Sequence, residues 1–170
     1  QTCALPICAQ TYLMPNGSTS ESYTTCSGTF YDDGGASGNY SNNLGGGGVI
    51  TFCPSIPGQR IKIVFTSFSS ETSVGSGCID YLEVWNNSTA GPRTFPTTAD
   101  DVICGLINSP VTIVSTNANG CLTFRFRSNN NTNGSGWAAT ISCVNPCVIP
   151  TASFNTTTPD FLCAGAGGAT

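Results

Sequence analysis

The chain has 170 residues, which is enough for one domain with a core of ordinary size. It carries only 5 basic and 9 acidic residues, so its formal net charge is −4. Because binding to nucleic acid or to an anionic membrane surface needs clustered Lys and Arg, this composition argues against both partners. No apolar run approaches the length of a membrane span.

Ten cysteines occur in a chain that has no histidine. Zinc sites commonly combine Cys with His or use Cys-x-x-Cys pairs, and neither pattern is present. The intervals from Cys26 to Cys53, from Cys78 to Cys104 and from Cys121 to Cys143 instead enclose long loops. This spacing is typical of disulfides, which indicate an oxidising, extracellular compartment.

The N-terminal part is not expected to contribute to the main domain. Residues 1–7 resemble one reading frame of a sequencing adapter, so we exclude them from the fold as non-native. Residues 8–25 follow as a lead-in, which begins at Cys8 with a segment similar to the tail of a secretory signal peptide. An ordered strand over Thr11 to Met14 is the alternative for the residues just after it.

From Ser27 to Cys143 short alternating segments recur at even spacing, separated by Gly, Pro and Asn turns. This arrangement is typical of an all-β sandwich, and no helical period competes with it. We therefore predict an antiparallel β-sandwich with a core that includes Ile61, Ile63, Phe65, Leu82, Val84, Leu122, Phe124, Phe126, Trp137, Ala139 and Ile141.

The C-terminal part differs in composition from the predicted sandwich. Residues 144–150 contain two prolines and are interpreted as a linker. Residues 151–170 are interpreted as the truncated start of a second domain, and further domains of the same polypeptide are expected after residue 170.

Several segments of residues 26–143 resemble the CUB family in order and spacing: PGQRIKIVFTSF at 57–68, CIDYLEV at 78–84, CG at 104–105, LTFRFRS at 122–128 and GWAA at 136–139. The start of the domain departs from the animal pattern, since residues 30–35 and 39–43 stand where a Ser-Pro and Tyr-Pro run is usual. With the additional Cys121 and Cys143, this variant resembles CUB-like domains of large secreted bacterial proteins.

The resemblance implies a jelly-roll-like sandwich of two sheets with disulfides Cys26–Cys53 and Cys78–Cys104. The pairing of the remaining cysteines stays open. If the side chains of Leu122 and Trp137 both face the core, strand parity places Cys121 and Cys143 on opposite faces of their strands. A bulge or a twist would be needed to join them, and pairing of Cys143 with Cys147 is the alternative.

Glu71 and Asp80 are the principal candidate site, in or next to a loop rich in Gly and Ser. In calcium-binding CUB domains the matching positions are metal ligands, so the resemblance implies a Ca²⁺ site here. A third acid is expected after Ser128, where this chain has Asn129, and Tyr40 matches the tyrosine that braces the acids. Calcium accepts carboxylate and carbonyl oxygens from irregular loops. The alternative is that both acids are ordinary solvated side chains.

Two other groups of residues have both a functional and a simpler structural explanation. Asp32 and Asp33 could form a second oxygen-rich site, although such a pair more often forms an Asx-turn, here before Gly34. The aromatic residues Tyr31, Tyr81 and Trp85 could form a platform for a sugar ring, or pack against neighbouring side chains.

These residues give little support for a catalytic function. The sequence has no histidine to activate a serine, and the cysteines are expected to form disulfides. We predict a non-catalytic, secreted binding or adhesion module that recognises a protein or carbohydrate ligand with calcium assistance. A structural spacer and an accessory domain of an exported peptidase or glycosidase are the alternatives.

Overall fold

The computed structural model describes residues 10–44, 48–75, 77–94 and 97–146. The predictions for residues 1–7 and 151–170 lie outside these ranges. Within them the chain forms ten strands: β1 (Thr11–Leu13), β2 (Ser20–Thr24), β3 (Ser27–Tyr31), β4 (Val49–Cys53), β5 (Arg60–Ser69), β6 (Tyr81–Trp85), β7 (Asp101–Cys104), β8 (Val111–Val114), β9 (Leu122–Arg127) and β10 (Gly136–Val144).

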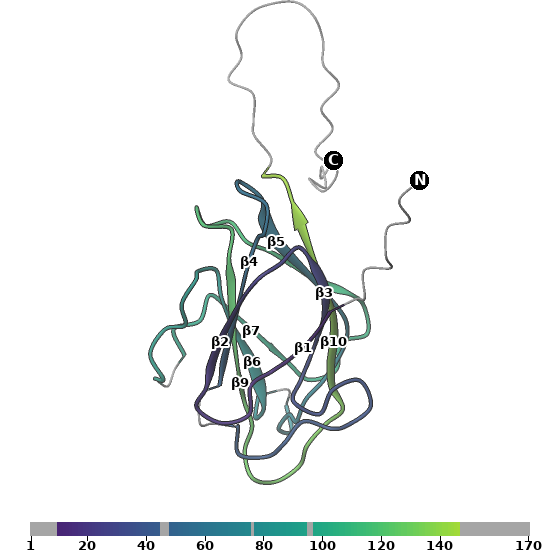
Figure 1. The fold of residues 1–170 in the computed structure, drawn as a ribbon. Helices are drawn as coiled ribbons and strands as arrows, with labels where there is room; N and C mark the ends of the chain where they lie inside the picture. The colour runs from purple at the N-terminus through teal and green to yellow at the C-terminus, as the bar shows by residue number, and fades with distance from the viewer. Residues whose placement is uncertain (1–9, 45–47, 76, 95–96, 147–170) are drawn as a thin grey trace, which may run out of the picture.

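The strands form two five-stranded sheets that pack face to face, which confirms the predicted all-β sandwich (Figure 1). Sheet A has the order β1-β3-β10-β5-β8, and sheet B has the order β2-β4-β9-β6-β7. The pairs β1–β3 and β2–β4 are parallel, whereas all other pairs are antiparallel. The sheets are therefore mixed, and the parallel pairs lie at one edge of each.

Both parallel edge strands come from the segment that was interpreted as a lead-in. Thr11–Leu13 pairs with β3 in sheet A, and Ser20–Thr24 pairs with β4 in sheet B. The ordered strand near Thr11 is thus present. Because Tyr12 and Met14 are also buried in the core, the sandwich includes residues that precede Cys26.

The alternating residues fill the space between the sheets as predicted. Ile61, Ile63 and Phe65 of β5 are fully buried, and so are Leu122 and Phe124 of β9. Burying each such side chain contributes roughly 1.5–3 kcal/mol to folding before entropy is counted. The remaining predicted core residues are buried as well: Leu82, Val84, Phe126, Trp137, Ala139 and Ile141.

The predicted pairing of Cys26 with Cys53 is wrong. The structure joins Cys26 to Cys143 and Cys53 to Cys121, whereas Cys78 pairs with Cys104 as expected. Cys121 and Cys143 lie in or beside strands of different sheets, and they do not pair with each other. Pairing of Cys143 with Cys147 is excluded because Cys143 is already bonded.

Strand register explains the bond between Cys26 and Cys143. Ser27 of β3 lies opposite Ser142 of antiparallel β10, so the two cysteines occupy the next position of the same ladder. Their Cα atoms are 4.9 Å apart, close to the spacing of about 4.5 Å between directly opposed residues that share no backbone hydrogen bond. The disulfide therefore extends the β3–β10 ladder by one pair.

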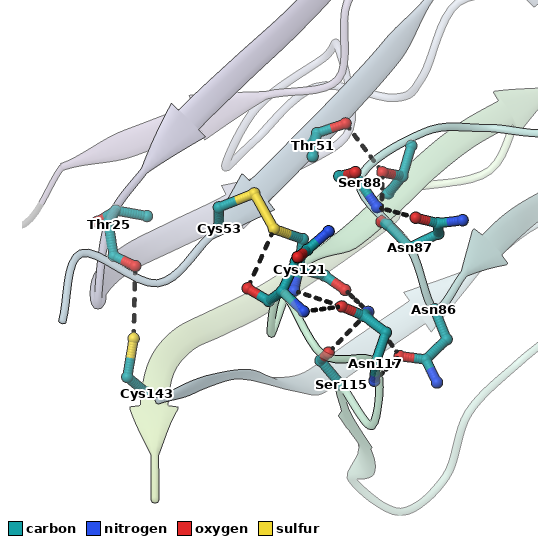
Figure 2. The surroundings of a disulfide bond; sticks show 12 residues. Thr25, Thr51, Cys53, Asn86, Asn87, Ser88, Ser115, Asn117, Cys121 and Cys143 are labelled. Carbon is teal, nitrogen blue, oxygen red and sulfur yellow. Dashed lines mark hydrogen bonds between the residues drawn. A yellow bond between two sulfur atoms is a disulfide. The ribbon is translucent and has the colours of Figure 1, made fainter. Parts of the chain in front are cut away.

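The bond between Cys53 and Cys121 follows the same rule in the other sheet. Phe52 of β4 lies opposite Leu122 of β9, which places Cys53 opposite Cys121 with a Cα separation of 4.2 Å. Asn117 holds the turn before β9 at this point, since its Nδ2 donates to the carbonyl oxygen of Cys121 over 2.6 Å (Figure 2). Each sheet thus has one covalent link across an antiparallel strand pair.

We expect non-reducing peptide mapping to recover Cys26 linked to Cys143 and Cys53 linked to Cys121. Replacing both cysteines of either pair by alanine should lower the free energy of unfolding by roughly 2–5 kcal/mol, because the cross-link restricts the unfolded chain. Urea denaturation measures this loss. Recovery of a peptide that links Cys26 to Cys53 would contradict the register described here.

Candidate functional site

Four residues from separate parts of the chain meet at one end of the sandwich, and we call them the acid edge: Tyr40, Glu71, Asp80 and Asn129. Glu71 follows β5, Asp80 precedes β6, Asn129 follows β9, and Tyr40 lies in the long loop after β3. All four were predicted as members of one site. The structure brings them within hydrogen-bond distance of one another.

Asp80 is the centre of this network, and its side chain is fully buried. Its Oδ2 accepts a hydrogen bond from the Tyr40 hydroxyl over 2.7 Å, and its Oδ1 accepts one from the Asn129 backbone N–H over 2.8 Å. The Asn129 side-chain Nδ2 donates to Oε2 of Glu71 over 2.7 Å. Asn129 therefore connects both carboxylates.

Burial raises the pKa of Asp80, although the hydrogen bonds from Tyr40 and Asn129 act in the opposite direction and the nearby Glu71 adds to the rise. Burial and the hydrogen bond to Asp80 raise the pKa of Tyr40 to about 12. The tyrosine hydroxyl consequently stays protonated and remains a donor to the carboxylate.

Backbone contacts fix the loop that carries the two acids. The N–H groups of Ile79 and Asp80 both donate to the carbonyl oxygen of Glu71. Ser70 Oγ donates to the carbonyl oxygen of Asp80 over 2.7 Å and accepts from the N–H of Gly105 over 2.9 Å. Together with the Cys78–Cys104 disulfide, these bonds hold Glu71 beside Asp80. The bracing role of Ser70 was not predicted.

The Tyr40 loop is attached to the end of β9. Ser128 Oγ donates to the carbonyl oxygen of Ser41, and the N–H of Leu44 donates to Ser128 Oγ. The N–H of Asn43 donates to the carbonyl oxygen of Asn129 over 2.6 Å. These contacts place Tyr40 beside Asp80, although the two residues are far apart in the sequence.

The oxygen donors of the acid edge suit a hard cation such as calcium, which takes carboxylate, amide and backbone carbonyl oxygens. Glu71 and Asp80 contribute two negative charges, whereas Asn129 directs its Nδ2 toward Glu71 and its Oδ1 accepts from the N–H of Asn131 over 2.7 Å. No cluster of three or more potential metal-ligating side chains from His, Cys, Asp and Glu occurs in the described ranges. Glu71 and Asp80 are the charged groups that could hold a cation at this edge.

Solved structures with a similar fold include MASP-1 CUB domains. The full extracellular region of zebrafish Gpr126/Adgrg6 matches with a TM-score of 0.55 and 20% identity, over 77% of this chain and 15% of that one. The MASP-1 CUB2 domain bound to Ca²⁺ matches with a TM-score of 0.52 and 20% identity, over 75% of this chain and 99% of that one. The chain has a CUB-like fold.

The CUB1-EGF-CUB2 region of human MASP-1/3 gives a TM-score of 0.51 at 18% identity, over 76% of this chain and 43% of that one. The chain thus spans 15% of the zebrafish structure and 43% of the human one. No protein-family model and no curated protein matches the sequence. At these identities the likeness concerns the CUB-like fold itself.

Asp32 has a structural role in this CUB-like sandwich, and the Asx-turn explanation is confirmed. Its Oδ1 accepts from the N–H of Gly34 over 2.8 Å, and its Oδ2 accepts from the N–H of Trp137 over 3.0 Å. Gly136 has a φ of 66°, and a Cβ atom there would lie 1.9 Å from Asp32 Oδ2. Glycine is therefore required at the start of β10. Asp33 instead accepts from the N–H of Ser41 over 3.0 Å.

The aromatic residues do not form a platform. Trp85 is 5% exposed, and its ring lies 4.7 Å from the guanidinium of Arg125. Tyr31 belongs to sheet A, whereas Tyr81 and Trp85 belong to sheet B. The interpretation as packed side chains therefore holds for Trp85.

A buried ionic network on the outer face of sheet B was not predicted. Glu83 Oε2 lies 2.6 Å from Arg125 Nε and 3.0 Å from Arg127 Nε, and the Glu83 side chain is fully buried. Thr97 from the loop between β6 and β7 donates to the other carboxylate oxygen. Burial alone would raise the pKa of Glu83, but the donors Arg125, Thr97 and Arg127 outweigh it and lower the pKa.

We expect Glu83→Gln to destabilise the domain by roughly 3–5 kcal/mol at neutral pH, because buried Arg125 and partly buried Arg127 lose their counter-charge. Since the native pKa is lowered, the stabilisation is complete above the unfolded-state value near 4.5 and is lost as pH falls below it. Urea denaturation from pH 7 to pH 3 should show the two proteins converging in acid.

The exposed Asp101→Asn variant is the matched control and should follow the unmodified protein at every pH. A constant difference between Glu83→Gln and the unmodified protein across the pH range would contradict the lowered pKa of Glu83.

Proposed function

We propose that this CUB-like domain is a non-catalytic extracellular module that binds a macromolecular partner through the acid edge, with calcium assistance. The observation that carries the proposal is the convergence of Glu71 and buried Asp80 on Asn129 at one end of the sandwich. Building such a site costs free energy, because a buried carboxylate must have its lost hydration replaced. A binding function accounts for that cost.

The absence of histidine from the sequence supports a non-catalytic role for these residues, since no imidazole is present to activate a nucleophile. Six cysteines are committed to disulfides. Three disulfides in one domain also favour an extracellular location, where oxidising conditions maintain them. In the described part of the chain, no helix has the length and apolarity needed to cross a bilayer.

Calcium would be held by the carboxylates of Glu71 and Asp80 and by an oxygen of Asn129. Its charge would compensate the repulsion between two neighbouring carboxylates. In this structure Asn129 performs that compensation with its two N–H donors. In the calcium-loaded state Asn129 would present its amide oxygen instead, and the missing third carboxylate predicts a weak site.

The surroundings of the acid edge favour a protein partner. Val74 in the loop between Glu71 and Asp80 is fully exposed, and Leu106 beside Ser69 is 70% exposed. Exposed apolar side chains beside fixed polar groups provide the two kinds of contact that protein interfaces combine. A basic side chain of the partner would complement Glu71, which remains partly exposed.

We expect about 10 mM calcium to raise the melting temperature by several degrees, because a dissociation constant on the order of 10⁻⁴ to 10⁻³ M gives about 1.4–2.7 kcal/mol of stabilisation. Asn129→Asp should enlarge the rise by restoring a third carboxylate, and Glu71→Gln should abolish it. Differential scanning calorimetry with and without calcium provides the measurement.

Asp101→Asn is again the control, since it removes one exposed carboxylate outside the acid edge. Magnesium at the same concentration should have little effect, because it demands a tighter octahedral geometry. An unchanged melting temperature in calcium would show that Glu71 and Asp80 do not bind the ion.

A further inference from the structure

A second site lies on the outer face of sheet B, away from the acid edge. A pocket of about 400 Å³ opens between strands β2 and β4 and the loop that follows β6. Its volume is within the range of small-ligand sites, and none of the four acid-edge residues lines it. Hydroxyl groups dominate the polar part of its lining: Ser20, Ser22, Thr51, Ser88 and Thr89.

The loop wall of this pocket is fixed to β9. Arg125 Nη1 donates to the carbonyl oxygen of Gly91 over 3.3 Å, and Nη2 donates to that of Pro92 over 3.4 Å. Thr123 Oγ1 donates to the carbonyl oxygen of Asn87 over 2.8 Å. The pocket is therefore formed before any ligand arrives, which lowers the entropic cost of binding.

The hydroxyl of Thr51 is oriented by the same contacts. It lies 2.9 Å from Thr123 Oγ1, whose proton is already donated to Asn87, so Thr51 must donate to Thr123. The Thr51 oxygen keeps acceptor capacity. Ser20 and Ser22 are exposed on the same edge of the sheet, and their hydroxyls can both donate and accept.

The pocket also presents an available positive charge. Of its two cations, Arg125 is paired with Glu83 over 2.6 Å, whereas exposed Arg93 makes no hydrogen bond or ion pair among the described residues. The carboxylate in the lining, Glu21, accepts a hydrogen bond from the Tyr23 hydroxyl over 2.7 Å. Arg93 is thus free to bind an anion, and its planar guanidinium suits the parallel oxygens of a carboxylate or sulfate.

We propose that this pocket binds an acidic sugar unit of a polysaccharide. The serine and threonine hydroxyls exchange hydrogen bonds with the sugar hydroxyls, and Arg93 pairs with the carboxylate or sulfate group. Val49 and Ala90 are the apolar side chains of the pocket lining. The site is independent of calcium and of the acid edge.

Isothermal titration calorimetry of the whole chain in EDTA tests the proposal with three tetrasaccharides: a galacturonate, a sulfated galactan and a neutral galactan. At least one acidic sugar should bind about tenfold more tightly than the neutral one, because an ion pair with Arg93 adds to the hydroxyl contacts. The two acidic probes distinguish carboxylate from sulfate recognition. Added salt should weaken binding.

Two pairs of variants locate the site. Arg93→Gln should weaken acidic-sugar binding about tenfold, whereas Lys62→Gln removes the same charge from β5 of the other sheet and should leave it unchanged. Ser22→Trp should block the pocket, whereas Thr24→Trp, also exposed on β2 but not a lining residue, should not.

Equal binding of neutral and acidic sugars, absence of binding at millimolar sugar, or full binding by Arg93→Gln and Ser22→Trp would each overturn the proposal. Because the titrations contain EDTA, such a failure leaves the calcium-dependent rise in melting temperature, and with it the proposed function of the acid edge, as a separate question.

Discussion

The buried carboxylate of Asp80 is the constraint on which the acid edge depends. A carboxylate removed from water requires hydrogen-bond donors, and Asp80 obtains them from the Tyr40 hydroxyl and the Asn129 backbone. These donors come from two different loops. The hydrogen bonds to Asp80 therefore hold the loop after β3 and the loop after β9 against the start of β6. In this arrangement Glu71 lies within hydrogen-bond distance of Asn129.

The covalent links complement this polar network. Cys26–Cys143 and Cys53–Cys121 lie beside the starts of β5 and β9, whereas the acid edge lies at the ends of the same two strands. One end of the sandwich is thus held by cross-strand disulfides. The other end is held by Cys78–Cys104 and by hydrogen bonds, so its loops can present side chains to a partner.

Alternation in the sequence predicted which residues face the core, because side-chain direction in a strand has a period of two. Ile61, Ile63 and Phe65 illustrate this success. Alternation does not specify which strands are neighbours, so the partner of Cys26 could not be derived from it. The acid edge was predicted from a family resemblance. The burial of Glu83 was not predicted, because a polar loop that folds over a sheet has no distinctive sequence pattern.

A double-mutant cycle on Tyr40→Phe and Asp80→Ala tests most directly whether the buried carboxylate organises the acid edge. Urea denaturation of the four proteins should give a coupling free energy of roughly 1.5–3 kcal/mol, as expected for a hydrogen bond to a charged group. The matched control cycle combines Asp80→Ala with Tyr31→Phe, on β3 of sheet A. The effects of these two mutations should be additive to within about 0.5 kcal/mol. Additive effects of Tyr40→Phe and Asp80→Ala would contradict the account.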